Sequence, residues 1–171
     1  MMNADLQLAY KTFKSDPTSR SQFSSLAKAL GENANFADLL RASRLFETSG
    51  KDQRLALYYQ RWALFGRRRF EEALEVAEAM TQGDEAQPND FSWVVKILTR
   101  LGRNDEAIKV AQGALATWPD HDGLTANLAA ASQPAPAADP RVAQTAQIKP
   151  APGARPRPDK KTTGKRGKAR R

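Results

Sequence analysis

The sequence predicts an all-α protein, and three observations lead to this prediction. Apolar residues recur three and four positions apart in one segment after another, a spacing that places them on one face of a helix. Glycine and proline separate these segments at helix-sized intervals. No segment combines strict apolar/polar alternation with an excess of β-branched residues, as a half-buried strand would. We therefore expect helices and no sheet.

The helical segments can be placed one after another by their turn signals. Asp16 and Pro17 suit an N-cap and a first helical residue, since proline is preset for that position and its missing N–H costs nothing there. Gly31 is expected to stop the helix that follows. Gly50, Gly66, Gly83, Gly102 and Pro119 close later segments in the same way. The expected helices cover approximately residues 6–13, 23–30, 36–46, 57–65, 70–80, 91–98, 107–115 and 124–131.

The apolar pattern has a 34-residue period. Large apolar residues occur in the same place in three successive segments, at positions Phe23, Leu57 and Phe91 and again at Leu30, Leu64 and Leu98. The short run that begins with Phe70 and continues to Leu74 resembles the run that begins with Asn104, in the same register. Three units in one register indicate an internal repeat with this period.

This sequence resembles the tetratricopeptide repeat (TPR) family, whose unit is a 34-residue helix–turn–helix. Residues 88–121 carry the best match, with Gly102 in the turn, Ala107 and Ala114 at small positions of the second helix, and Pro119 after it. The resemblance implies a TPR-like antiparallel helical array, a short α-solenoid, with units at about 20–53, 54–87 and 88–121. A plain antiparallel helical array is the alternative.

The middle unit departs from the family pattern. Arg61 stands where the family prefers a small residue. The first helix of that unit is therefore expected to be shifted relative to the strict repeat register, so that Ala63 occupies the small-residue position. The first unit has Leu39 where alanine is usual.

The resemblance also implies a groove lined by the first helix of each unit. On the strict register the groove-facing positions are Ser24, Lys28, Leu55, Tyr58, Trp62, Asn89, Ser92, Lys96 and Thr99. Among these, Lys28, Leu55, Tyr58, Trp62 and Lys96 are the candidate partner-binding residues, because an apolar-aromatic centre flanked by lysines suits a peptide or helix with apolar anchors and some acidic character. The alternative is that Tyr58 and Trp62 only pack between repeats.

The family's carboxylate clamp, which grips an acidic C-terminus, is not reproduced here. Ser24 and Trp93 stand where clamp residues would be needed. A chaperone C-terminus is therefore not the expected ligand.

The net charge of +8 is distributed unevenly. Residues 1–133 carry 16 Lys and Arg against 17 Asp and Glu, whereas residues 134–171 carry 11 against 2. All 13 aromatic residues precede residue 134, and 7 of the 10 prolines follow it. We expect a helical domain over 1–133 and a disordered, Pro/Ala-rich basic tail over 134–171, because the tail cannot bury enough apolar area to offset its ordering entropy.

The end of this tail is a candidate anion-binding segment. Seven of the last twelve residues are cationic and none is anionic: Lys160, Lys161, Lys165, Arg166, Lys168, Arg170 and Arg171. Such segments bind DNA, RNA or anionic lipid through counterion release, and the lack of aromatic residues argues against base-specific reading. A tail that only aids solubility is the alternative.

No catalytic, metal or cofactor constellation is present in the sequence. The chain has no cysteine, and its one histidine, His121, has no second ligand at helical spacing. Three adjacent arginines follow Gly66, namely Arg67, Arg68 and Arg69. They either bind an acidic or phosphate group or form a solvated turn whose positive charge balances the glutamates after it. No secretory signal or membrane span is recognised, so a cytoplasmic protein is expected.

Two functions are compatible with these observations. The first is a non-enzymatic adaptor or chaperone-like module that binds a segment of another protein in a TPR groove. The second is a nucleic-acid-associated protein in which the basic tail supplies non-specific affinity. No cofactor is expected for either one.

Overall fold

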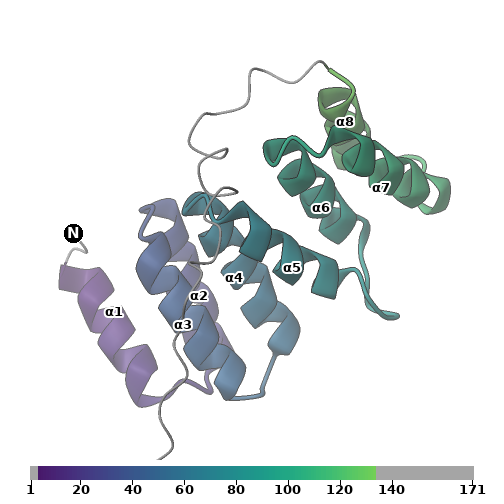
Figure 1. Cartoon of the computed structure of the whole chain (residues 1–171). Coiled ribbons are helices and arrows are strands. Elements are labelled where there is room, and N and C mark those ends of the chain that lie inside the picture. The colour runs from purple at the N-terminus through teal and green to yellow at the C-terminus, as the bar shows by residue number, and fades with distance from the viewer. Residues whose placement is uncertain (1–3, 134–171) are drawn as a thin grey trace, which may run out of the picture. The chain divides into compact units, whose positions relative to one another are not determined.

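The helices form where the apolar spacing places them. A computed structural model describes residues 4–133, a range that holds eight helices and no strand (Figure 1). The all-α prediction is therefore confirmed for this range. The helices are α1 (Ala4–Ser15), α2 (Arg20–Glu32), α3 (Phe36–Thr48), α4 (Gln53–Gly66), α5 (Phe70–Met80), α6 (Pro88–Arg100), α7 (Asn104–Thr117) and α8 (Asp122–Ala131). The candidate anion-binding residues of the tail lie outside the described residues.

Each helix packs against the next one along the chain, as short connections require. Additional contacts join α1 to α3, α2 to α4 and α6 to α8. Small residues make these close approaches possible, because they let neighbouring helices come near enough to bury the larger side chains. Ala107 and Ala114 of α7 are buried in this way, as are Ala73 and Ala77 of α5. Within residues 4–133, none of the helices has the length and apolar character to cross a membrane.

The bounds of the helices recur with the same period as the apolar pattern. The helices α3, α5 and α7 begin at Phe36, Phe70 and Asn104. The helices α2, α4 and α6 end at Glu32, Gly66 and Arg100, again at equal intervals of one repeat. The repeat in the apolar pattern is thus also a repeat in the secondary structure.

The three turns that follow α2, α4 and α6 share one backbone conformation. Their second residues, Ala34, Arg68 and Gly102, all have positive φ angles, of 55°, 59° and 75°. In each turn the next N–H donates to the carbonyl oxygen five residues earlier, over 2.9 to 3.0 Å. Only the third turn has glycine, the residue that adopts this conformation without a steric cost.

Replacing Ala34 by glycine is therefore expected to raise the free energy of unfolding by about 1 kcal/mol, because it removes the left-handed strain of a residue with a Cβ. Ala34 is exposed, so no packing is lost. Gly102→Ala is the reciprocal control: nothing lies within 4 Å of the added Cβ, so only the backbone strain changes, and stability should fall by a similar amount. Urea unfolding measures both variants. A lower stability of Ala34→Gly would contradict the shared turn geometry.

Two local expectations are wrong. Gly31 does not stop a helix, because it lies within α2, where it is buried. Asp16 and Pro17 do not start α2, which begins at Arg20 with Ser19 as its N-cap. Asp16 instead accepts hydrogen bonds from the N–H and hydroxyl of Thr18, at 3.2 and 2.6 Å, in the turn before the helix.

The expected slide of the middle unit does not occur. Helix α4 ends at Gly66, in the same register as the ends of α2 and α6. Arg61 itself occupies the buried position that Ala27 and Val95 occupy in α2 and α6. Ala63 is also buried, two positions further along the helix.

Candidate functional site

Three of the predicted groove residues lie on α4. Tyr58 is 38% exposed, and Leu8 on α1, at 65%, is the only other large apolar side chain that is so exposed in the described range. Leu55 and Trp62 are half-buried on either side of Tyr58 along the helix. An exposed aromatic ring at this position is available to a partner.

Trp62 joins α4 to α2. Its indole ring lies so close to the backbone of Gly31 that a Cβ there would be 2.3 Å from the ring. The ring centroid is 6.1 Å from that of Tyr59, which packs in turn on Phe23 of α2 at 5.4 Å. Gly31 thus serves as a site of close approach, and Trp62 contributes to the α2–α4 contact as well as to the exposed face.

Leu55 and Tyr58 line a shallow hollow of about 330 Å³. Met80 adds a third apolar side chain to its wall. The remaining lining residues are polar or charged: Arg20, Asp52, Arg54, Gln87, Asn89 and Asp90. The hollow is therefore lined by both apolar and charged side chains.

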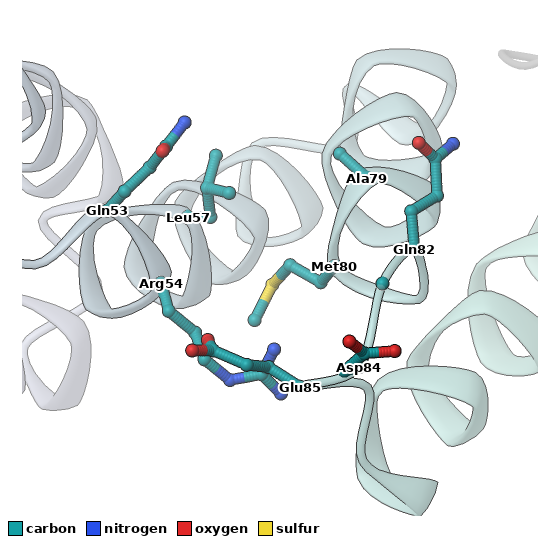
Figure 2. A pocket seen from close by; sticks show the side chains of 9 residues that line it. Gln53, Arg54, Leu57, Ala79, Met80, Gln82, Asp84 and Glu85 are labelled. Atoms are coloured by element: carbon teal, nitrogen blue, oxygen red, sulfur yellow. The ribbon is translucent and has the colours of Figure 1, made fainter.

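A second hollow of about 330 Å³ adjoins the first and shares Arg54 and Met80 with it. Figure 2 shows the side chain of Met80 pointing into this hollow from the end of α5. Asp84 and Glu85, from the loop before α6, are its acidic residues. Its other lining residues are Gln53, Leu57, Ala79, Gln82 and Gly83.

The two predicted lysines have different surroundings. Lys96 on α6 is exposed, and its Nζ lies 4.8 Å from the ring centroid of Trp93 and 5.3 Å from that of Phe65. These cation–π contacts hold Lys96 beside the aromatic side chains of α4 and α6. Lys28 on α2 is exposed, and its Nζ lies 3.9 Å from a carboxylate oxygen of Glu32 on the same helix. The structure therefore places Leu55 and Tyr58 in one hollow, Lys96 beside Phe65 and Trp93, and Lys28 on α2.

The residue that lies between Tyr58 and Trp93 was not among the predicted groove residues. Arg61 is fully buried, and its guanidinium carbon lies 5.1 Å from the ring centroid of Tyr58 and 4.8 Å from that of Trp93. Its Nη1 donates to Oδ1 of Asp90 over 3.3 Å and lies 3.5 Å from the sulfur of Met80. Burial lowers the pKa of Arg61, whereas the Asp90 carboxylate raises it and so opposes that effect.

Asp90 is almost fully buried and connects α4 to the start of α6. Its Oδ2 accepts from the backbone N–H of Gln87, at 3.0 Å, which is one half of the capping box of α6. The same oxygen also accepts from Nη2 of Arg54. One carboxylate is therefore shared by the guanidinium groups of Arg54 and Arg61.

Two donors of Arg61 have no acceptor. Within the described part of the chain, its buried Nε and Nη2 make no hydrogen bond. Unsatisfied donors on a buried cation are energetically costly, since no water or carbonyl replaces the lost hydration. A signal for this arrangement was present in the sequence, namely an arginine at a position where the residues 34 places before and after it are the apolar Ala27 and Val95.

Other candidates have structural roles. His121 is the N-cap of α8, where its Nδ1 accepts from the N–H of Leu124 at 3.1 Å. Arg69 forms an ion pair with Glu72 in the first turn of α5. Ser92, a predicted groove position, is instead buried, and its carbonyl and hydroxyl oxygens accept from the side-chain amide of Asn127 on α8. No group of acidic or histidine side chains suited to a metal is found among residues 4–133.

Comparisons with protein-family models, curated proteins and solved structures gave no match for this chain.

Proposed function

We propose that this chain is a TPR-like interaction module that binds a segment of another protein along the face formed by α2, α4 and α6, as an adaptor or chaperone-like protein without enzymatic activity. Two regularities support the repeat assignment: helix bounds that recur with the period of the sequence and a left-handed residue at the same place in three turns. In such an array the first helix of each unit contributes to one face.

The exposed ring of Tyr58 is the observation that carries the binding proposal. It stands beside Leu55 over a hollow, and aromatic side chains of this kind contribute much of the energy at protein interfaces. The exposed cations on the same three helices include Arg20, Lys28 and Lys96. A partner segment with an apolar anchor and acidic neighbours complements this combination.

Site-specific photo-cross-linking tests where a partner binds. A photoreactive phenylalanine analogue at position 58 should form a covalent adduct with a partner in cells, because the native ring is exposed there. The same analogue at Glu75, an exposed position on α5, is the control and should give no such adduct. Adducts of equal yield at both positions, or none at position 58, would contradict the assignment of the face.

The purified partner then allows a quantitative prediction. Tyr58→Ala should weaken binding by about 2 kcal/mol, the loss typical of an aromatic hot spot. Its melting temperature should change little, because the ring is partly exposed in the free protein. Leu8→Ala removes the other large apolar side chain that is exposed among residues 4–133 and should leave the affinity unchanged. Isothermal titration calorimetry measures the affinities. An equal loss for both variants would count against a specific role of Tyr58.

A second function, non-specific binding of nucleic acid, is favoured by the charge of the tail. If four to seven of the cations in 160–171 contact phosphates together, log K should fall against log salt with a slope of roughly −3.6 to −6.3 on duplex DNA. Fluorescence anisotropy at several salt concentrations measures this slope. A full-length variant with the seven basic residues changed to glutamine keeps the tail length and should not bind. Binding retained by that variant would move the site to the helical part, and no binding by the wild-type chain at low salt would contradict the second function.

A further inference from the structure

The charged cluster between α4 and α6 has more cations than anions. The guanidinium groups of Arg54 and Arg61 share the single carboxylate of Asp90. Asp52, the other acid that lines the adjoining hollow, is engaged elsewhere: it lies 2.7 Å from Nε of Arg20 and accepts from the N–H of Leu55 at 2.9 Å. Arg54 also borders the second hollow, together with Asp84 and Glu85. Among the described residues, Asp90 is thus the one acid that hydrogen-bonds to Arg61, and it is shared with Arg54.

The unsatisfied donors lie in this cluster. Nε and Nη2 belong to Arg61, whose side chain is fully buried, so solvent does not replace the missing acceptor. A carboxylate oxygen would supply both an acceptor and the opposite charge, and hydrogen bonds between ionised groups are the strongest of their kind. A buried cation left in this state costs stability, which is offset when an anion binds.

We propose that Arg61 and Arg54, together with Asp90, form a recognition subsite for one acidic side chain of the partner segment, with the ring of Tyr58 as its movable cover. This inference rests on the proposed binding face and specifies the chemistry of its partner. It gives a role to an arginine that otherwise breaks the repeat pattern.

Access to the subsite runs past Tyr58. The hollow is lined in part by Tyr58, Met80, Arg54 and Asp90. The Arg61 guanidinium is in contact with Tyr58, Met80 and Asp90. The guanidinium thus lies directly behind the wall of the hollow. The ring of Tyr58 is 38% exposed and its centroid lies 5.1 Å from that of Tyr59, so the subsite opens only when this ring changes rotamer.

The occupant is a protein carboxylate beside an apolar residue. Leu55, Tyr58 and Met80 give the hollow apolar surface, which suits an aliphatic or aromatic neighbour of the acid. Asp52 and Asp90 on the same wall repel a run of phosphates more strongly than a carboxylate, which carries one negative charge. The basic end of the tail has the wrong sign of charge for this position.

Two small probes test the subsite on the full-length chain. N-acetyl-leucyl-glutamate amide should shift the NMR signal of the Arg61 Nε–H and that of the Trp93 indole N–H, because Trp93 stacks on the same guanidinium. The isosteric N-acetyl-leucyl-glutamine amide should bind about tenfold more weakly or not at all, since it lacks the charge. Equal shifts with both probes, or no shift with either, would overturn the proposal. Stronger binding of inorganic phosphate at the same signals would also overturn it.

A substitution separates recognition from a structural role. Arg61→Met substitutes a shorter, uncharged and unbranched side chain and leaves Asp90 paired with Arg54. The melting temperature should therefore change little, while the response of the Trp93 indole to the glutamate probe is lost. A fall in melting temperature with the probe response retained would mean that Arg61 has only a structural role. If Arg61→Met does not fold, the comparison of the two probes on the wild-type chain remains decisive.

The outcomes also separate this inference from the proposed function. Cross-linking of a protein at position 58 together with equal binding of both probes would contradict the proposed subsite and still support the proposed binding face. Selective binding of the glutamate probe at Arg61 with no cross-link at position 58 would leave the subsite and contradict the proposed partner face.

Discussion

Asp90→Ala is expected to lower the free energy of unfolding by about 3–5 kcal/mol, the cost of removing one partner from a buried ion pair. The change leaves the buried guanidinium of Arg61 without an anion and removes the acceptor that Arg54 shares with it. It also removes one half of the capping box of α6. Urea unfolding of the full-length chain, followed by far-ultraviolet circular dichroism, measures the loss.

Asp84→Ala is the matched control for this prediction. Asp84 is an exposed aspartate in the loop before α6, and its removal should change the stability by less than about 0.5 kcal/mol. Combining Asp90→Ala with Arg61→Met should recover part of the stability, because the unpaired buried charge is then absent. Similar losses for Asp90→Ala and Asp84→Ala would show that the pair between α4 and α6 contributes nothing.

Phe23→Ala is expected to cost about 3–5 kcal/mol, as deletion of a fully buried aromatic ring does. The ring of Phe23 is stacked on that of Phe46 at a centroid distance of 4.1 Å and also contacts Phe13 and Tyr59 at 5.6 and 5.4 Å. The cavity would therefore lie where α1, α2, α3 and α4 meet. Thermal and urea unfolding give the loss.

Phe91→Ala is the control at the corresponding position of α6. Phe91 is half-buried and contacts Trp118 at 5.4 Å, so its removal should cost clearly less than that of Phe23. If both variants lose the same stability, burial of the Phe23 ring does not account for the effect.

The sequence could predict the helices because their signal is local. The apolar spacing around Phe23, Phe36 and Phe70 identifies the buried face without knowledge of what covers it. The 34-residue period was visible for the same reason, because it is a recurrence of this local apolar spacing. In the structure, helix ends and turn residues recur with the same period.

The surroundings of Arg61 could not be predicted in this way. A charged residue in a repeat is expected to face solvent, and its burial depends on Asp90, which lies 29 residues away on another helix. The burial of Ser92 also depends on a partner outside its own segment, because α8 covers it. The same holds for Gly31, whose function follows from the position of the Trp62 ring.

The attachment of α8 has a practical consequence for protein engineering. Helix α8 begins at Asp122, one repeat length after the first residue of α6, and Asn127 donates to the carbonyl and hydroxyl oxygens of Ser92 at 2.9 and 2.7 Å. A further repeat unit inserted ahead of Asp122 would separate these two partners. The added unit must therefore carry a serine at the position equivalent to Ser92, so that α8 finds the same acceptors on its new neighbour and the lengthened protein keeps this contact.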